Sequence, residues 1–368
     1  MAIYSIALDK KYDNYSVFAY DIIIGGSKLS KSEYPVIEIN THSTLETSTM
    51  NDCEFTVFVG YDYEKHGFDK DIYSIFQMGK QVEVKLGYGS ILKGVFNGYI
   101  NSVGCNFSES GIVVRVQCLD AKGVLKNKYE WSAKEDPNDI DLIKGVLQRC
   151  CSMYGTIDMS GVDESQKKKV KVDRIVQKQD ALSYLIKYAK SYGYTFCTFY
   201  KKIYFGKFTV AEAKSIPGVS LSWGKNLLSF QHEADLTNQI GTVKVIGYNK
   251  KREKVEGKCS KLSGKGKSGS ELATVVKDKT IILEEIEAEN ASIANQLAKG
   301  VLNRSAGNFV HCQGRMIGLP EVCIGSKITI EQTLKGINGD YILSEVTHSF
   351  SGQGYITEFK ATSSKLFL

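Results

Sequence analysis

The chain has 368 residues, of which 42% are hydrophobic and 24% charged. This length predicts two or three domains, and the composition excludes a mainly disordered chain. The formal net charge of +6 is too small to indicate nucleic-acid binding by itself. Abundant Tyr and Phe with 34 Gly and only 4 Pro favour strands joined by glycine turns, and exclude collagen and coiled-coil architectures.

The first 118 residues carry strand patterns. Apolar residues alternate with polar ones over 53–59, 82–86 and 112–118, and this period of two is typical of strands with one buried face. We therefore predict a β domain over residues 1–120.

The pattern changes near residue 120. Asp136-Pro137 is a typical helix start, and an apolar stripe follows from Ile143 to Tyr154. A second helix is expected between a cap at Asp180 and a stop at Gly193, before a hairpin over 194–207. We predict a small α/β accessory domain over residues 121–210.

Strand patterns return over 211–368, with one helix expected at 291–306 behind Asn290. Before that helix, residues 250–267 hold eight basic and two acidic side chains, an excess of +6. The basic residues are Lys250, Lys251, Arg252, Lys254, Lys258, Lys261, Lys265 and Lys267. We predict an exposed, mobile loop at 250–270, because so few apolar residues cannot offset the entropy of ordering it.

The basic segment has three interpretations. It is a solvated linker, a docking site for an acidic partner surface, or a contact for nucleic-acid phosphate. Only Tyr248 flanks it as an aromatic residue, so base stacking has no support. Its eight basic residues are our candidate partner-docking site.

One segment pattern occurs twice. Residues 79–84 resemble residues 325–330, and 103–111 match 346–354 at a constant offset of 243. Order and spacing both hold, which favours duplication of one strand–turn–strand unit over chance similarity.

No catalytic, cofactor-binding or metal site is predicted. Gly266-Lys267-Ser268 resembles the end of a phosphate-binding P-loop, but position 261 is not Gly. The five His form no HxxxH or HExxH pair and the nine Cys no CxxC pair, so packing roles are expected for Cys150-Cys151 and His311-Cys312. A hydrolytic carboxylate pair stays open, since its members can be remote in sequence.

No secretory signal or membrane-length apolar run is visible, and the scattered cysteines favour synthesis in a reducing cytoplasm without membrane insertion.

The order of these segments resembles a known family. The segments are Gly79–Gly89, Phe96–Ile100, the helix at 180–193 with its hairpin, Leu221–Leu228, Val243–Tyr248, and the helix at 291–304 with the following strands to Ala361. Together they resemble the phage late control protein D family, whose relatives include the hub region of VgrG spike proteins. Residues 1–34 match no part of it, and the basic segment is not a family hallmark.

The resemblance implies a mainly β (α+β) fold, with two related tube-like β-barrel domains per chain and a small α/β domain between them. We expect this α/β domain to face outward, because the repeated segments bracket it and each of its helices carries a single apolar stripe. It implies a non-enzymatic homotrimeric baseplate hub that joins a sixfold tail tube to a threefold spike in a phage tail, tailocin or injection system. Expected partners are the tail tube protein, a separate spike protein, other baseplate proteins and tape-measure or effector cargo, with nucleic acid only as cargo in the lumen. The alternatives are a tail-associated peptidoglycan hydrolase and a tail tube or distal tail ring protein.

Overall fold

A computed structural model describes the residues 4–62, 64, 66–67, 71–109, 111–126, 139–162, 180–208, 218–249, 252–262, 266–288, 290–307 and 309–368. The helix start expected at Asp136-Pro137 and the basic residues Lys250, Lys251 and Lys265 lie outside these ranges.

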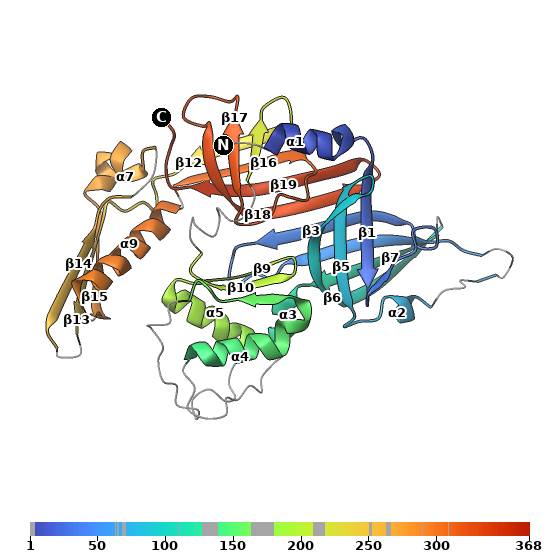
Figure 1. The fold of residues 1–368 in the computed structure, drawn as a ribbon, viewed down its shortest axis with the longest axis horizontal. Coiled ribbons are helices and arrows are strands. Elements are labelled where there is room, and N and C mark those ends of the chain that lie inside the picture. The colour runs from blue at the N-terminus through green and yellow to red at the C-terminus, as the bar shows by residue number, and fades with distance from the viewer. Residues whose placement is uncertain are drawn as a thin grey trace.

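Within the described residues, thirteen strands form one sheet, whose two halves we call the first and second β units (Figure 1). The first β unit contains β1 (Phe18–Ile24), β2 (Ser27–Lys28), β3 (Val36–Thr44), β4 (Asp52–Val59), β5 (Gln81–Tyr88), β6 (Ile91–Ser108) and β7 (Gly111–Leu119). The second contains β11 (Val219–Ser222), β12 (Leu227–Ala234), β16 (Val310–Ile317), β17 (Lys327–Glu331), β18 (Gly339–Ser351) and β19 (Gly354–Ser363). The units join where β3 pairs antiparallel with β18.

The predicted alternation is confirmed by burial. In β4 the side chains of Cys53, Phe55, Val57 and Val59 are all buried, while the residues between them are partly exposed. One cluster of buried side chains spans both β units, because their apolar faces pack together. The expected mainly β fold is thus confirmed.

The second β unit repeats the first. The strand orders β3-β4-β7-β6-β5 and β12-β16-β19-β18-β17 correspond, and the cross-strand partners correspond with them. Equivalent pairs are Val82–Gly98 and Ile328–Tyr341, Val103–Val116 and Val346–Phe359, and Cys53–Cys118 and Cys312–Ala361. The duplication suggested by the sequence is therefore present in the register of the sheet, and it extends to β3 and β4, where the sequence showed no repeat.

Irregularities of the sheet repeat as well. The ladder of β6 with β7 shifts register at Asn101, and that of β18 with β19 shifts at Ser344. A second bulge makes Ile37 the extra residue of β3 and Leu228 the extra residue of β12. Bulges are specific features of a fold, so their recurrence supports a common origin of the units.

The α/β module lies between the units in sequence. It contains α3 (Ala121–Lys126), α4 (Asp139–Cys151), η2 (Ser152–Tyr154), β8 (Thr156–Asp158), α5 (Ala181–Tyr192), β9 (Thr195–Phe199) and β10 (Lys202–Gly206). The Asp180 carboxylate caps α5 by accepting from the Ser183 amide at 2.8 Å, and Gly193 ends it with a φ of 66°. Both predicted helix signals are confirmed, and the module has its own buried cluster.

The prediction of a loop over 250–270 is wrong for much of this segment. Residues 242–307 form an insert with β13 (Thr242–Tyr248), β14 (Lys254–Cys259), α7 (Gly269–Leu272), α8 (Thr274–Lys277), β15 (Thr280–Glu287) and α9 (Ala291–Gly307). β14 pairs with β13, and α9 packs on the sheet so closely that a Cβ at Gly257 would lie 2.3 Å from the Ala294 carbonyl carbon. The Val255 side chain is buried in the core of the insert, where α9 covers the sheet. The composition of residues 250–270 does not reveal that α9 will pack there. The insert has a buried cluster of its own, apart from the second β unit.

The N-terminal segment, which the resemblance left unplaced, binds the second β unit. Helix α1 (Tyr4–Lys11) and η1 (Asp13–Tyr15) precede β1, and Leu8 and Tyr12 are buried in the shared core. The Glu321 carboxylate accepts from Tyr12 Oη at 2.7 Å and from Lys11 Nζ at 2.6 Å. Residues before β1 therefore connect the two units. Helix α2 (Ile72–Ile75) lies between β4 and β5 in the chain (Figure 1).

Candidate functional site

The described basic residues of the candidate docking site lie on the insert. Arg252, Lys254, Lys258, Lys261 and Lys267 are all exposed. Lys254 Nζ forms an ion pair at 2.6 Å with Glu256, two residues along β14 on the same face of the strand. The charges are thus held by a strand and its flanking residues, and they remain accessible to a partner.

Both β units also carry a polar face, opposite the apolar face that packs in the core. In the first unit Arg115 Nε contacts Glu54 Oε1 at 2.6 Å, and Gln117 Nε2 donates to Glu54 Oε2 at 3.0 Å. The corresponding strands of the second unit bear Gln231, Gln313, Arg315, Glu358 and Lys360. Cross-strand pairs of opposite charge stabilise such a face modestly and keep it hydrated.

The polar face of the second unit is hollowed. A cavity of about 420 Å³ is lined mainly by polar groups, including those of Gln313, Arg315, Glu345 and Lys360. Lys360 Nζ lies 2.8 Å from Glu345 Oε2. The charged groups pair with one another, and the lining residues include no His or Cys. This arrangement is suited to polar contact with a partner or with cargo.

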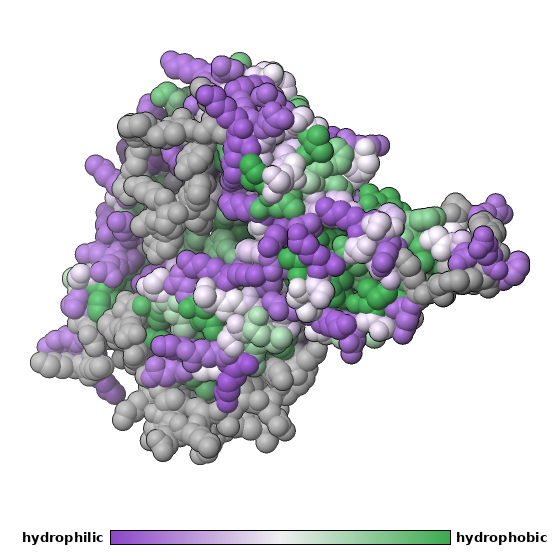
Figure 2. All heavy atoms as spheres, turned by 45° about the vertical axis from the view of Figure 1, so that its right-hand side comes forward, coloured by the Kyte–Doolittle hydropathy of each residue, from purple (hydrophilic) through white to green (hydrophobic). Residues whose placement is uncertain are grey.

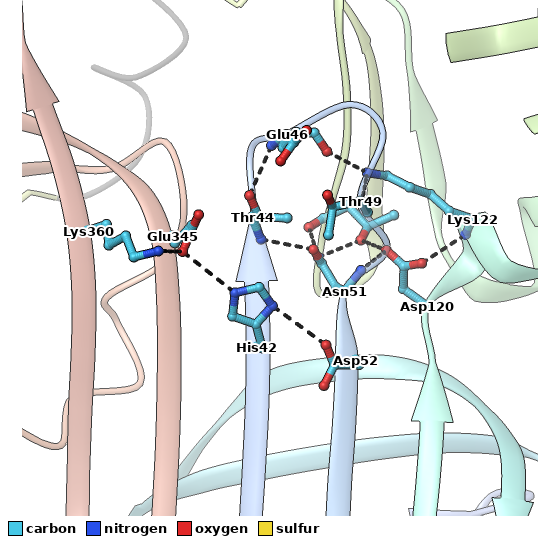
Figure 3. A network of polar contacts seen from close by, with 11 residues as sticks. His42, Thr44, Glu46, Thr49, Asn51, Asp52, Asp120, Lys122, Glu345 and Lys360 are labelled. Carbon is cyan, nitrogen blue, oxygen red and sulfur yellow. Dashed lines mark hydrogen bonds and ion pairs between the residues drawn. The ribbon is translucent and has the colours of Figure 1, made fainter. Parts of the chain in front are cut away.

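The His42 side chain lies at the junction between the two units, between Asp52 of the first and Glu345 of the second (Figure 3). Its Nδ1 lies 3.5 Å from Asp52 Oδ1, and its Nε2 lies 3.9 Å from Glu345 Oε2. The hydrogen bond to Asp52, followed by the charge of both carboxylates, raises the pKa of His42 above its ordinary value. When it is protonated, the imidazole links β4 of one unit to β18 of the other.

A buried polar network joins the first β unit to the α/β module (Figure 3). Asp120 Oδ2 accepts from the Asn51 amide at 3.1 Å and from Thr198 Oγ1 at 2.6 Å. The Asn51 side chain donates to the Thr198 carbonyl at 3.0 Å and accepts from the Thr44 amide at 3.0 Å. Burial raises the pKa of Asp120. These bonds fix β9 of the module to the ends of β3 and β4.

Lys122 extends this network although its side chain is fully buried. Its ammonium group donates to the Thr49 carbonyl at 2.6 Å and to the Glu46 carbonyl at 3.2 Å, and it lies over the Phe196 ring. Burial lowers the pKa of Lys122, while the charge of Asp120 opposes that shift. A buried ammonium group is retained only where such partners compensate it.

The sequence analysis did not single out Asn51, Asp120 or Lys122. The only signal in the sequence was that Asn51 lies just before one predicted strand and that Asp120 lies just after another. Their partner Thr198 is 78 residues from Asp120, so local patterns could not reveal the contact.

His348 is the buried histidine of the second unit. Its Nε2 lies 3.1 Å from the Val322 carbonyl, which only accepts, so the proton belongs on this nitrogen. Its Nδ1 then accepts from the hydroxyls of Thr357 and Tyr355, at 3.0 and 2.9 Å. Burial lowers the pKa of His348 to about 4.

Among the described residues, no group of three or more His, Cys, Asp or Glu side chains is placed to hold a metal ion. No described helix is long and apolar enough to cross a membrane.

The fold is similar to solved structures of phage tail proteins. The 43 kDa tail protein of prophage MuSo2 from Shewanella oneidensis is 12% identical, with 94% of this chain and 98% of that chain covered and a TM-score of 0.65. The tail protein from Neisseria meningitidis MC58 is 13% identical, with coverage of 94% and 97% and a TM-score of 0.63. The expected tail-protein fold is thus confirmed.

A second kind of neighbour comes from a secretion system. A component of the E. coli type VI secretion system, itself described as similar to T4 tail proteins gp27 and gp5, is 12% identical with coverage of 92% and 76% and a TM-score of 0.56. No curated protein matches the sequence. The family model described as Alg8 N-terminal domain matches residues 14–352, nearly the whole chain. The chain therefore belongs to the Alg8 N-terminal domain family.

Proposed function

We propose that this protein is a structural, non-enzymatic hub of the baseplate of a contractile phage tail, tailocin or injection system, of the late control protein D and VgrG type. The observation that carries the proposal is the repeat of one β unit with the same strand order, register and bulges. Three chains with two units each would place six similar units around one axis. Such a ring adapts a sixfold tail tube to a threefold spike.

The polar face supports this function. Its paired charges, such as Arg115 with Glu54 and Lys360 with Glu345, suit the hydrated wall of a lumen. Tape-measure or effector protein, or nucleic acid, would pass through that lumen as cargo. The tube protein, a separate spike protein and other baseplate proteins are the proposed partners, with the α/β module facing outward and assembly following synthesis in the bacterial cytoplasm.

The test is the copy number in the assembled ring. The chain is co-expressed with the tail tube protein encoded in the same gene cluster. The complex is examined by native mass spectrometry and electron microscopy. Three copies per ring are expected. Six copies would indicate a tube or distal tail ring protein instead, and clearing of a peptidoglycan suspension by the purified chain would indicate a hydrolase.

We further propose that the basic residues of the insert dock on an acidic neighbour in the baseplate. Changing Arg252, Lys258 and Lys261 to Glu should leave the unfolding temperature nearly unchanged, since all three side chains are exposed. The same change should weaken binding of the chain to the assembled baseplate in a salt-dependent way. Each exposed ion pair contributes roughly 0.2–1 kcal/mol and is screened by salt.

The matched control reverses the exposed Lys126, Lys144 and Lys190 of the α/β module. Equal weakening by both triple variants would indicate a general charge effect and would contradict docking through the insert.

A further inference from the structure

The ladder between β3 and β18 shows how one β unit attaches to another. It runs from Glu38 opposite Ser351 to Thr44 opposite Glu345. β3 is the end strand of the first unit, and the paired part of β18 lies beyond the end of β17, whose last ladder partner on β18 is Ile342. An end strand of one unit thus pairs with an overhanging strand of the next.

The chain also contains a second copy of each of the two strands that form this joint. In these second copies, no described strand pairs with the edge that the joint would use. β12, the equivalent of β3, is the end strand of the second unit. β6, the equivalent of β18, continues beyond β5, whose last ladder partner on β6 is Tyr99. Among the described strands, none pairs with the outer edge of β12 or with the second edge of β6 from Ser102 to Asn106. Such edges are templates for pairing with another chain.

We propose that β12 of one copy of this chain pairs antiparallel with β6 of a second copy, in the register of the β3–β18 ladder. Transferring that register through the equivalent positions gives specific partners. They are Val103 with Ala234, Gly104 with Glu233, Cys105 with His232, Asn106 with Gln231, and Phe107 with Phe230. The number of copies that close the ring rests on the proposed hub function, whereas the strand pairing does not.

The aromatic and aliphatic side chains of the β3–β18 joint are buried, whereas their equivalents on β6 and β12 are more exposed. This difference is expected if β6 and β12 pair only when two copies meet. Phe350 and Ile39, opposite each other in the completed joint, are 6% and 0% exposed. Their equivalents are Phe107, which is 69% exposed, and Phe230, which is half-buried. Figure 2, which brings the right-hand side of Figure 1 forward, shows apolar patches exposed between bands of polar side chains. Pairing with a second copy would cover the exposed Phe107 ring.

The charges of the two edges are compatible. Glu233 would face Gly104, and Gln231 would face Asn106, so no like charges oppose each other. The contact is head-to-tail, because β6 and β12 are different surfaces of the same chain. Repetition of a head-to-tail contact gives a closed ring when its rotation closes, and a closed ring leaves neither edge open.

Disulfide cross-linking tests the register. Asn106→Cys with Gln231→Cys should give covalent multimers on oxidation that a reductant disperses, because directly opposed residues lie within disulfide distance. Asn106→Cys with Glu233→Cys should not, since a partner two residues away along the strand is about 7–8 Å distant. Asn40→Cys with Ser349→Cys is the positive control, because these residues are opposed within one chain and should close without a change of mass.

The outcomes separate this inference from the proposed function. A ring of three copies in which the control pair closes and the Asn106–Gln231 pair does not would overturn the strand pairing and leave the hub function intact. A cross-linked ring of six copies would support the pairing and contradict the trimeric hub. As a second measurement, Phe107→Asp should lower the fraction of multimer at least tenfold while the unfolding temperature of the monomer changes little; unchanged multimer would also overturn the pairing.

Discussion

His42 and His348 lie on adjacent strands, and their surroundings shift the pKa in opposite directions. His42 is half-buried beside Asp52 and Glu345, so its pKa is raised. It stabilises the junction below its unfolded pKa, and this contribution is lost as pH rises through the higher folded value. His348 is buried with neutral hydrogen-bond partners, and burial lowers its pKa from 6.5 to about 4. It remains neutral in the folded protein at pH values where the unfolded chain binds a proton.

We predict that His348 makes the fold sensitive to acid. Stability should fall as pH decreases from 6.5 to about 4, by on the order of 3 kcal/mol at the lower limit, because the unfolded state binds the additional proton. His348→Gln should lose stability at pH 7 but show a smaller further loss at pH 4.5, measured by urea unfolding at both values. A parallel pH dependence of wild type and variant would contradict the assignment.

The network around Asp120 should be sensitive to removal of a single member. Asp120→Ala leaves the Lys122 ammonium group and the Asn51 amide buried without their compensating carboxylate, and we expect a loss of about 3–5 kcal/mol in unfolding free energy. Urea denaturation followed by circular dichroism measures it. Asp340→Ala is the control: its carboxylate pairs with Lys327 at 3.0 Å on the surface, where an ion pair contributes about 1 kcal/mol or less. Equal losses in the two variants would refute a special role for the buried network.

At the scale of elements, the repeated bulges carry repeated side chains. Ile37 of β3 and Leu228 of β12 occupy the same bulge and are 45% and 48% exposed. An exposed aliphatic residue at one site is ordinary, but the same residue class at both equivalent sites indicates a shared contact. In the proposed ring, these positions would present six similar apolar contacts.

We predict that Ile37→Asp with Leu228→Asp weakens binding to a sixfold partner without unfolding the chain. Substitutions at exposed sites usually change stability by about 0.5 kcal/mol or less. Pull-down of the tail tube protein and thermal unfolding measure the two effects. The exposed Ile282 of the insert, changed to Asp, serves as control; binding that is lost equally in this control would rule out a specific contact at the bulges.

At the scale of the whole molecule, the part of the chain that the structure describes holds three separate buried clusters. The two β units share one large cluster of aromatic and aliphatic side chains. The insert depends on a small cluster that includes Val243, Val255, Ala294 and Leu302. Apolar area sets most of the stabilisation, and Ala and Val supply little of it.

We therefore predict that the insert opens locally while the sheet remains folded. Hydrogen exchange followed by mass spectrometry should show faster exchange in β13 and β14 than in β5–β7, because local opening requires less free energy than global unfolding. Identical protection in both regions would show that the insert and the sheet unfold together.

The sequence alone determined the strands with clear alternation, such as those over 53–59 and 112–118, the start and end of α5 at Asp180 and Gly193, and part of the duplication, because alternation, capping and glycine turns are local. Gly79 and Gly325, for example, both have a positive φ, and their amides donate to Ile100 and Leu343 at 2.8 Å. Only the tertiary structure decided that β3 joins β18, that Asp120 meets Thr198, and that Lys254–Cys259 forms a strand of the insert. Each of these depends on residues far apart in the chain, whose burial and hydrogen bonding exist only after the units have packed together. Composition predicted mobility for a segment that instead pairs with β13 and packs under α9, because local patterns do not report the surfaces that a segment will meet.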